Sequence, residues 1–397
     1  MATGMARSAL ILGLLSCVGP FAIDLYLPAM PDIGAALGAS VAETQMTITA
    51  YFIAFGLAQL VYGPWSDRVG RKLPLYFGLT IFIAGALLCA LAPTIGALIA
   101  GRFVQGLGGA VVMVVPRAII RDLHTGNAAT RLMATIMLVI SVSPMLAPLA
   151  GSGIIAVAGW REIFAALCGA AVVSLALTAF ALPETLPRED RAAFDLGVLI
   201  RGAVRLLSDR MFIGLTFIGG FGMASFFVFL ASASFVYTGA FGLSPTGFSL
   251  AFAFNAIGFF TSSQLAAGLG ERFGAPRVVA LATAGFATMT LITLALVAVG
   301  FGSLPVVVGG LFLGNACLGL VIPTTMVMAL DEHGDIAGLA SSLGGTLQML
   351  AGGAMIAATG PFFDGTALPM VAAIAFCGVL TVTLSALVLR RSARQSV

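Results

Sequence analysis

The sequence GPWSDRVGRK occupies residues 63–72, directly after a long apolar stretch. It is echoed by AGLGERFGAP at residues 267–276, which also follows an apolar stretch. Three positions of the first motif match three of the second at a constant offset of 204 residues, close to half of the 397 in the chain. The matching positions are Asp67, Arg68 and Gly70, then Glu271, Arg272 and Gly274. This repeat predicts two duplicated halves, each carrying the motif in a short loop between helices.

The composition is that of a membrane protein. Hydrophobic residues make up 60% of the chain and charged residues 9%, with a mean hydropathy of +1.09. Soluble proteins have about a quarter of their residues charged. A helix that crosses the hydrocarbon layer needs roughly 20 apolar residues, and only structures that pair their own backbone groups are tolerated there. We therefore expect an all-α polytopic membrane protein, and a water-soluble core is excluded.

Twelve stretches are long and apolar enough to be transmembrane helices. They cover residues 8–30, 43–65, 73–92, 95–120, 132–157, 163–182, 211–238, 247–269, 278–299, 303–330, 338–360 and 367–389. The only long polar connection divides these spans six and six. The expected organisation is an amino-terminal half over residues 1–182, a cytoplasmic linker over 183–210 and a carboxy-terminal half over 211–397.

The basic residues predict the orientation, because cytoplasmic loops retain Lys and Arg. With the amino terminus inside, only Arg161 falls clearly on the outer side, while Arg102 and Arg117 lie within the fourth span. Both termini and the linker are therefore expected in the cytoplasm. The net charge of +3 reflects this topology. No basic stretch is interleaved with aromatic residues, so a nucleic-acid partner is not expected.

Enzymatic and metal-binding functions are not predicted. His124 and His333 are the only histidines and lack metal-ligand spacing, and the five cysteines are scattered singly within spans. Neither a disulfide framework nor a metal cluster is indicated. The G-x-G of GLGERFG joins two apolar helices rather than following a strand, which excludes a dinucleotide site. No metal and no cofactor are expected.

The loop motif has a physical logic of its own. Gly63 and Gly70 permit a close backbone approach or a positive φ in a tight hairpin. Asp67 can accept hydrogen bonds from a helix amino terminus or from Arg71. An ordinary cytoplasmic loop would explain the basic residues, but not the glycine spacing or its repetition. We interpret the loop as a conformational latch, formed by Gly63, Asp67, Arg68, Gly70, Arg71 and Lys72.

On these residues, the loop resembles the cytoplasmic signature of the major facilitator superfamily, G-x-x-x-D-R-x-G-R-[RK]. GRFVQGLGGA, in the fourth span, resembles the R-x-x-Q-G-x-G pattern of its proton-coupled members. Three further stretches resemble the bicyclomycin-resistance branch of the twelve-span drug:proton antiporters, which also contains chloramphenicol exporters. They are IDLYLPAMP at residues 23–31, ASFVYTGAFGLSPTGFSLAFAFNA at 233–256 and GLASSLGGTLQ at 338–348.

The resemblance covers essentially the whole chain, and it implies both a fold and a function. The fold is the major facilitator fold of two pseudo-symmetric six-helix halves. The function is multidrug efflux by alternating access, driven by the proton gradient, across the inner membrane of a bacterium. The implied partners are a small-molecule substrate, protons and the lipid bilayer, with the protein as a monomer. A proton-coupled importer of a small nutrient would have the same fold and stays open as the alternative.

The fifth span partly matches the antiporter signature of this family, whose core reads G-P-x-x-G-G. The candidate antiporter-helix residues are Pro144, Pro148 and Gly151. Ala147 and Ser152 stand at the two other glycine positions of the core, but small residues of any of these types allow close helix contact. Generic helix packing is the alternative explanation for this pattern.

Two charged residues lie well inside spans, where each costs about 2.5–3.5 kcal/mol at the bilayer centre. Asp24 is in the first span and Arg102 in the fourth, both roughly 10 Å from the outer boundary at 1.5 Å per residue. The resemblance implies that both helices line the central cavity. We therefore predict that this pair couples proton movement to substrate transport, with a permanent structural ion pair as the alternative.

Further site residues follow from residue type and from the resemblance. Some multidrug relatives carry a second acid where this chain has Ser16, so neutral or zwitterionic drugs are favoured over cationic ones. The candidate lining residues, for which simple packing is the alternative, are Tyr26, Tyr51, Gln105, Phe226, Phe227, Phe252, Asn255, Asn315 and Gln348. The resemblance also implies that Asp122, at the cytoplasmic end of the fourth span, pairs with Arg71 and joins Asp67 in the latch.

Overall fold

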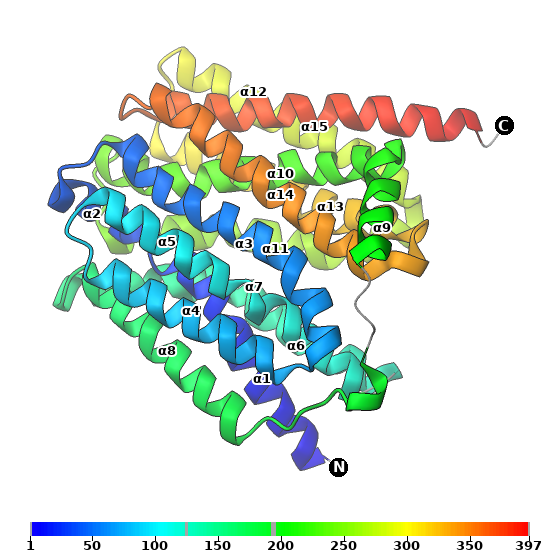
Figure 1. The fold of residues 1–397 in the computed structure, drawn as a ribbon. Coiled ribbons are helices and arrows are strands. Elements are labelled where there is room, and N and C mark those ends of the chain that lie inside the picture. Colours follow the sequence, from blue (N-terminus) through cyan, green and yellow to red (C-terminus); the bar gives the residue numbers. More distant parts are fainter. Residues whose placement is uncertain (1, 124–125, 192–195, 396–397) are drawn as a thin grey trace. The chain divides into compact units, whose positions relative to one another are not determined.

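The computed structural model describes residues 2–123, 126–191 and 196–395, and every regular element in these ranges is helical. The chain divides into two compact units, Met1–Asp195 and Leu196–Val397 (Figure 1). The boundary between them falls inside the predicted linker.

The first unit contains the helices that follow the first half of the sequence. They are α1 Ala2–Asp24, η1 Leu27–Ala29, α2 Met30–Leu37, α3 Val41–Val69, α4 Lys72–Ala90, α5 Ile95–Gly109, α6 Val111–Leu123, α7 Gly126–Val157, α8 Arg161–Phe180 and η2 Arg188–Asp190. The second unit starts with a short helix from the linker. Its elements are α9 Leu196–Ser208, α10 Arg210–Phe235, η3 Val236–Ala240, α11 Pro245–Phe273, α12 Ala275–Ala298, α13 Leu304–Asp331, η4 Gly334–Ile336, α14 Ala337–Thr359, η5 Gly360–Phe362 and α15 Ala367–Gln395.

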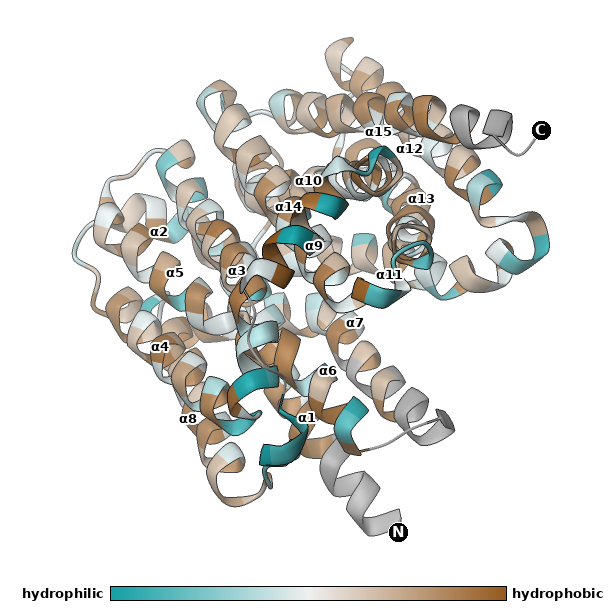
Figure 2. Ribbon diagram, turned by 45° about the vertical axis from the view of Figure 1, so that its right-hand side comes forward, coloured by the Kyte–Doolittle hydropathy of each residue, from teal (hydrophilic) through white to brown (hydrophobic). Residues whose placement is uncertain are grey.

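Within the described ranges, eleven helical stretches are long and apolar enough to cross a membrane. Brown, apolar residues dominate along the helices in Figure 2, and teal residues gather at loops and helix ends. The remaining predicted span, residues 338–360, also forms a long helix, α14. It is less apolar because it carries serine, threonine and glutamine among its glycines and alanines.

The two units repeat the same helix packing. In the first unit α3 packs against α5, α4 against α5 and α8, and α1 against α7. In the second unit α11 packs against α13, α12 against α13 and α15, and α10 against α14. Gly70 and Gly274 end α3 and α11 with φ of 99° and 84°. Their N–H groups donate to the carbonyls four residues earlier, so the repeated motif has a repeated backbone geometry.

The first predicted span, residues 8–30, is not one helix. α1 ends at Asp24, and the chain passes through a turn before η1 and α2 carry it on to Leu37. Pro28 and Pro31 stand in the first turns of these two short helices. A proline has no N–H to continue a preceding helix but fits the first turn of a new one. The correction places the predicted coupling residue, Asp24, at a helix end inside the membrane.

The fourth predicted span, residues 95–120, is also divided, because α5 and α6 meet at Ala110. Gly108 lies just before this point, where α5 contacts α4 directly. A Cβ at Gly108 would overlap the backbone nitrogen of Phe82 and the carbonyl oxygen of Gly78. Small residues that allow backbones to touch are a main source of helix association in membranes.

We expect Gly108→Ala to lower the free energy of unfolding by about 1–3 kcal/mol, because the added methyl group forces α4 and α5 apart. Gly169→Ala in α8 is the matched control, since nothing lies within 4 Å of a Cβ at that position. The control should be neutral or stabilise by up to about 1 kcal/mol, the gain in helix propensity. Thermal unfolding of the two purified variants in detergent measures the difference, and equal stability would contradict the close contact.

Candidate functional site

Arg102 is a fully buried cation on α5. Its guanidinium carbon lies 4.8 Å from the ring centroid of Tyr26 and 4.4 Å from that of Tyr51. Aromatic faces attract a cation at such distances, most strongly where water is excluded. The two tyrosines, predicted as lining residues, therefore form an aromatic enclosure for this charge.

The guanidinium also binds the broken end of α1. Nη1 of Arg102 donates to the carbonyl oxygen of Ala22 at 3.0 Å and to Oε1 of Gln105 at 2.6 Å. Ala22 lies in the last turn of α1, where carbonyl groups lack partners within the helix and the helix dipole favours a cation. Arg102 therefore caps α1 from α5.

Asp24 is the last residue of α1 and is 5% exposed. It forms no ion pair with Arg102 in the described part of the chain, where the ion pairs involve other acids. Instead, Nε and Nη2 of Arg102 and Nε2 of Gln105 are buried without a hydrogen-bond partner. All three are donors. Three buried donors at this site therefore lack an acceptor. The carboxyl group of Asp24 is only two residues along α1 from Ala22, which Arg102 binds.

The predicted antiporter helix, α7, packs against α1 at this position. Pro144 and Pro148 lie inside α7. A Cβ at Gly151 would overlap the carbonyl oxygen of Leu25, the residue that follows Asp24. Gly151 thus brings the backbone of α7 into contact with the break in α1.

The predicted lining residues also make contacts with other residues of their own unit. In the first unit, the hydroxyl groups of Tyr26 and Thr47 share a 2.7 Å hydrogen bond. In the second unit, the amide of Asn315 donates to Oδ1 of Asn255 at 3.3 Å. The remaining predicted lining residues of that unit make contacts within it: Phe252 stacks on Phe229, Phe226 stacks on Phe259, Phe227 lies against Gly352 and Gln348 lies against Gly219. Lining of a transport cavity stays a prediction for all of them.

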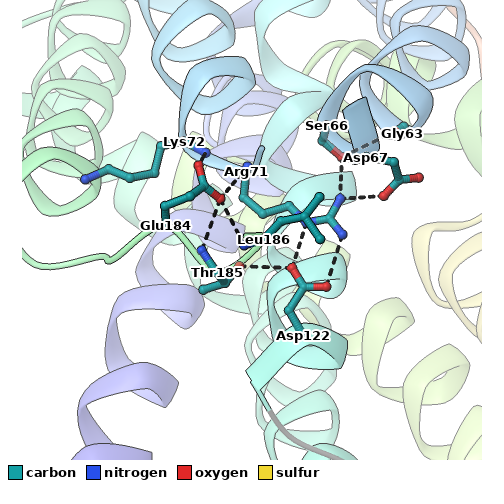
Figure 3. A network of polar contacts seen from close by, with 9 residues as sticks. All are labelled: Gly63, Ser66, Asp67, Arg71, Lys72, Asp122, Glu184, Thr185 and Leu186. Carbon is teal, nitrogen blue, oxygen red and sulfur yellow. Dashed lines mark hydrogen bonds and ion pairs between the residues drawn. The ribbon is translucent and has the colours of Figure 1, made fainter. Parts of the chain in front are cut away.

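Three of the predicted latch residues, Asp67, Arg71 and Asp122, meet at the loop motif of residues 63–72, shown in Figure 3. Nε and Nη2 of Arg71 donate to the two carboxylate oxygens of Asp122 on α6, at 2.7 and 3.0 Å. Nη1 of Arg71 donates to Asp67 and Ser66. Bidentate arginine–carboxylate pairs are among the strongest charge-assisted hydrogen bonds. The contact of Arg71 with both acids, implied by the resemblance, is therefore present.

Glu184 completes this network, and the sequence interpretation missed it. Its carboxylate accepts backbone N–H bonds from Arg71 and Lys72 at 2.8 and 3.2 Å, and from Thr185 and Leu186 at 3.0 and 3.2 Å. Burial alone would raise the pKa of Glu184, but these four donors outweigh it and hold the pKa below its usual value. The carboxylate is fully ionised at neutral pH. It stabilises the first turn of α4, and this stabilisation is lost only as the pH falls through the lowered pKa.

The sequence feature that could have indicated this role of Glu184 is its position between Pro183 and Pro187, directly after the sixth span. Glu184 lies in the predicted linker and is exposed there, so its residue type alone does not indicate these backbone partners. Gly70 explains the close fit, since a Cβ there would lie 2.6 Å from Oε2 of Glu184.

Gly63, by contrast, lies inside α3 and not in the hairpin, and its carbonyl accepts from Ser66. The α-helix continues to Val69, beyond the predicted end of the span.

The remaining latch residues lie at the ends of the same helices. Arg68 is exposed in the last turn of α3, where a cation complements the helix dipole. Nζ of Lys72 donates to the carbonyl oxygen of Ala179 at 3.2 Å.

Of the two histidines, His124 lies outside the described residues, and His333 pairs with Asp209 at 3.1 Å. In the described ranges, no group of three His, Cys, Asp or Glu residues could hold a metal.

Residues 12–356 match the Major Facilitator Superfamily. The chain belongs to this superfamily. It is therefore a multi-pass membrane transporter of small molecules and not an enzyme. An uncharacterized MFS-type transporter of Bacillus subtilis, YdgK, is 34% identical over 93% of this chain and 92% of its own length. A bicyclomycin resistance protein homolog of Haemophilus influenzae is 31% identical over 94% of each chain.

Among solved structures, the crystal structure of a D-xylose-proton symporter matches with a TM-score of 0.73. It is 16% identical and is aligned over 96% of each chain. At this identity the likeness concerns the fold alone, which is the major facilitator fold expected from the sequence.

We expect Glu184→Gln to weaken the network, because a neutral amide cannot replace the charge at the amino terminus of α4 or accept all four N–H bonds. The free energy of unfolding should fall by about 0.5–1.5 kcal/mol, since Glu184 is exposed and water can partly replace it, and transport should slow at matched expression. Glu189→Gln, an exposed change in the same linker, is the control and should behave like the wild type. Thermal unfolding and transport assays of both variants provide the comparison, and two indistinguishable variants would show that Glu184 has no such role.

Proposed function

We propose that this protein exports small, neutral or zwitterionic drug-like molecules in exchange for protons, by alternating access across the inner membrane of a bacterium. Both termini would lie in the cytoplasm and the monomer would be the functional unit. The superfamily membership and the relative named for bicyclomycin resistance support export. The observation that carries the coupling is the buried but unpaired arrangement of Asp24 and Arg102.

Two arrangements of these side chains follow from their hydrogen-bonding capacity. With Asp24 protonated, Arg102 would keep the hydrogen bond to the carbonyl of Ala22 that this structure shows. With Asp24 ionised, its carboxylate can accept from the free Nε or Nη2 of Arg102. Each buried donor left without a partner costs about 1–3 kcal/mol, so the second arrangement gains stability once the proton has left. Proton transfer would thus move the end of α1 relative to α5, which is the kind of two-state element that coupling requires.

The chain has a single acid in this part of the first unit, which limits the charge of the substrate. Ser16, which is 1% exposed, stands where some multidrug relatives have a second acid. A cationic drug would therefore compete with the proton for Asp24 alone. If one proton enters for each neutral molecule exported, one positive charge crosses the membrane per cycle. Export would then gain about 2.3 kcal/mol per 100 mV of membrane potential.

A panel of structurally unrelated antibiotics in a pump-deficient bacterium separates export from nutrient import. We expect expression of this protein to raise the inhibitory concentration of several neutral or zwitterionic compounds, because efflux lowers their cytoplasmic concentration. A vector without the gene and the Asp24→Asn variant are the controls. Unchanged resistance together with faster uptake of one nutrient would support the importer instead.

We expect Asp24→Asn to abolish uphill transport, because the amide can neither bind nor release the coupling proton. Passive exchange of solute should be spared, since no net proton movement is needed for it. The measurement uses proteoliposomes with an imposed pH gradient and membrane potential. Asp32→Asn is the matched control, because Asp32 lies in α2 at an exposed position. Accumulation by the Asp24→Asn variant at the wild-type level would overturn the proposed coupling.

A further inference from the structure

The broken end of α1 is held from two sides. Arg102 of α5 binds the carbonyl oxygen of Ala22 on one side. On the other side, α7 lies against the break: a Cβ at Gly151 would overlap the carbonyl oxygen of Leu25 and lie 3.1 Å from Cγ of Pro28. Because α7 contacts the first residues that follow α1, any movement of the end of α1 also displaces the contact with α7.

Ser143 places a hydroxyl group of α7 beside the carboxyl of Asp24. Ser143 is 1% exposed, lies close enough to Asp24 to act on its carboxyl, and its hydroxyl is buried without a hydrogen-bond partner in the described part of the chain. Serines in helices commonly donate to a carbonyl of the preceding turn. Ser152, on the same helix, does so with Leu149 at 2.9 Å. The hydroxyl of Ser143 is therefore available to Asp24.

From this geometry we infer that Ser143 is a positioning residue for the coupling proton: it stabilises the ionised carboxyl of Asp24 and transmits the change of charge to α7. The inference rests on the proposed role of Asp24. While Arg102 is bound to Ala22, the unpartnered hydroxyl of Ser143 on α7 can donate to the carboxylate. A hydrogen bond to a charged acceptor is stronger than one to a neutral acceptor. Loss of the proton therefore tightens the contact between α1 and α7.

The segment of α7 between these two contacts is suited to respond. Ser143 and Gly151 lie on either side of Pro148, and Pro144 follows Ser143 directly. Each proline removes one backbone N–H donor from the helix, and helices bend most readily where such bonds are missing. The prolines of the antiporter signature would accordingly let α7 change its bend when Ser143 binds or releases the carboxylate.

The test is an infrared titration of the purified protein in lipid, which needs no substrate. The carbonyl stretch of protonated Asp24 is identified by its loss in Asp24→Asn. We expect Ser143→Ala to move the pH midpoint of this band upward by about one unit, because the ionised carboxyl loses a donor worth about 1.5 kcal/mol or more. Ser143→Thr keeps the hydroxyl and should restore the wild-type midpoint. Ser152→Ala is the matched control on the same helix and should not shift it.

The outcomes separate this inference from the proposed function. An unchanged midpoint in Ser143→Ala, or the same shift in Ser152→Ala, would overturn the role of Ser143 while leaving the coupling by Asp24 intact. A band that Asp24→Asn does not remove at any pH would show that Asp24 does not titrate, and the inference would fail with it. The proposed function itself is decided separately, by uphill transport in proteoliposomes.

Discussion

The capping of a helix end by a buried cation is the interaction on which the first unit depends. α1 stops at Asp24, inside the membrane, because the two prolines that follow start new helical pieces. Backbone groups in lipid must find partners within the protein. Arg102 supplies one to Ala22, and the rings of Tyr26 and Tyr51 replace water around the charge. A break in α1 and a buried arginine on α5 are each costly alone, but together they satisfy each other.

The network around Arg71 and Glu184 follows the same principle with the charges reversed. There, the carboxylate of Glu184 accepts from the first N–H groups of α4, where the helix dipole favours an anion. Arg71 joins that end of α4 to the end of α6 through Asp122. Both sites thus place a charge at the helix terminus that it complements. They differ in exposure, because Arg102 is sealed from water while Asp67 in the network is half exposed.

Those parts of the fold that depend on local composition could be predicted from the sequence. The helical stretches, the duplication and the contact of Arg71 with Asp67 and Asp122 follow from hydropathy, from the repeated motif and from the family resemblance. The break after Asp24 was missed because a hydropathy window treats apolar Pro28 and Pro31 as part of the span. Glu184 was missed because two of its four partners, the backbone N–H groups of Arg71 and Lys72, lie more than a hundred positions away along the chain. Which donors Arg102 leaves unpaired depends on packing, and no spacing in the sequence reports it.

The two units share the same helix packing but not the same charged residues. α10 and α13 take the places of α1 and α5 in the packing of the second unit, and they carry charged residues only at their ends, Arg210 and Asp331. In the repeated loop motif, Ala275 stands at the position of Arg71. The second unit therefore cannot repeat the buried charges or the arginine of the latch, although its helices pack in the same order. Different ion pairs connect the helix ends of that unit: Arg205 with Asp335, and His333 with Asp209. A transporter built from two equal halves could respond to a proton in either one. The carboxyl and the cation of the proposed coupling pair both lie in the first unit, so protonation of Asp24 would act on that half.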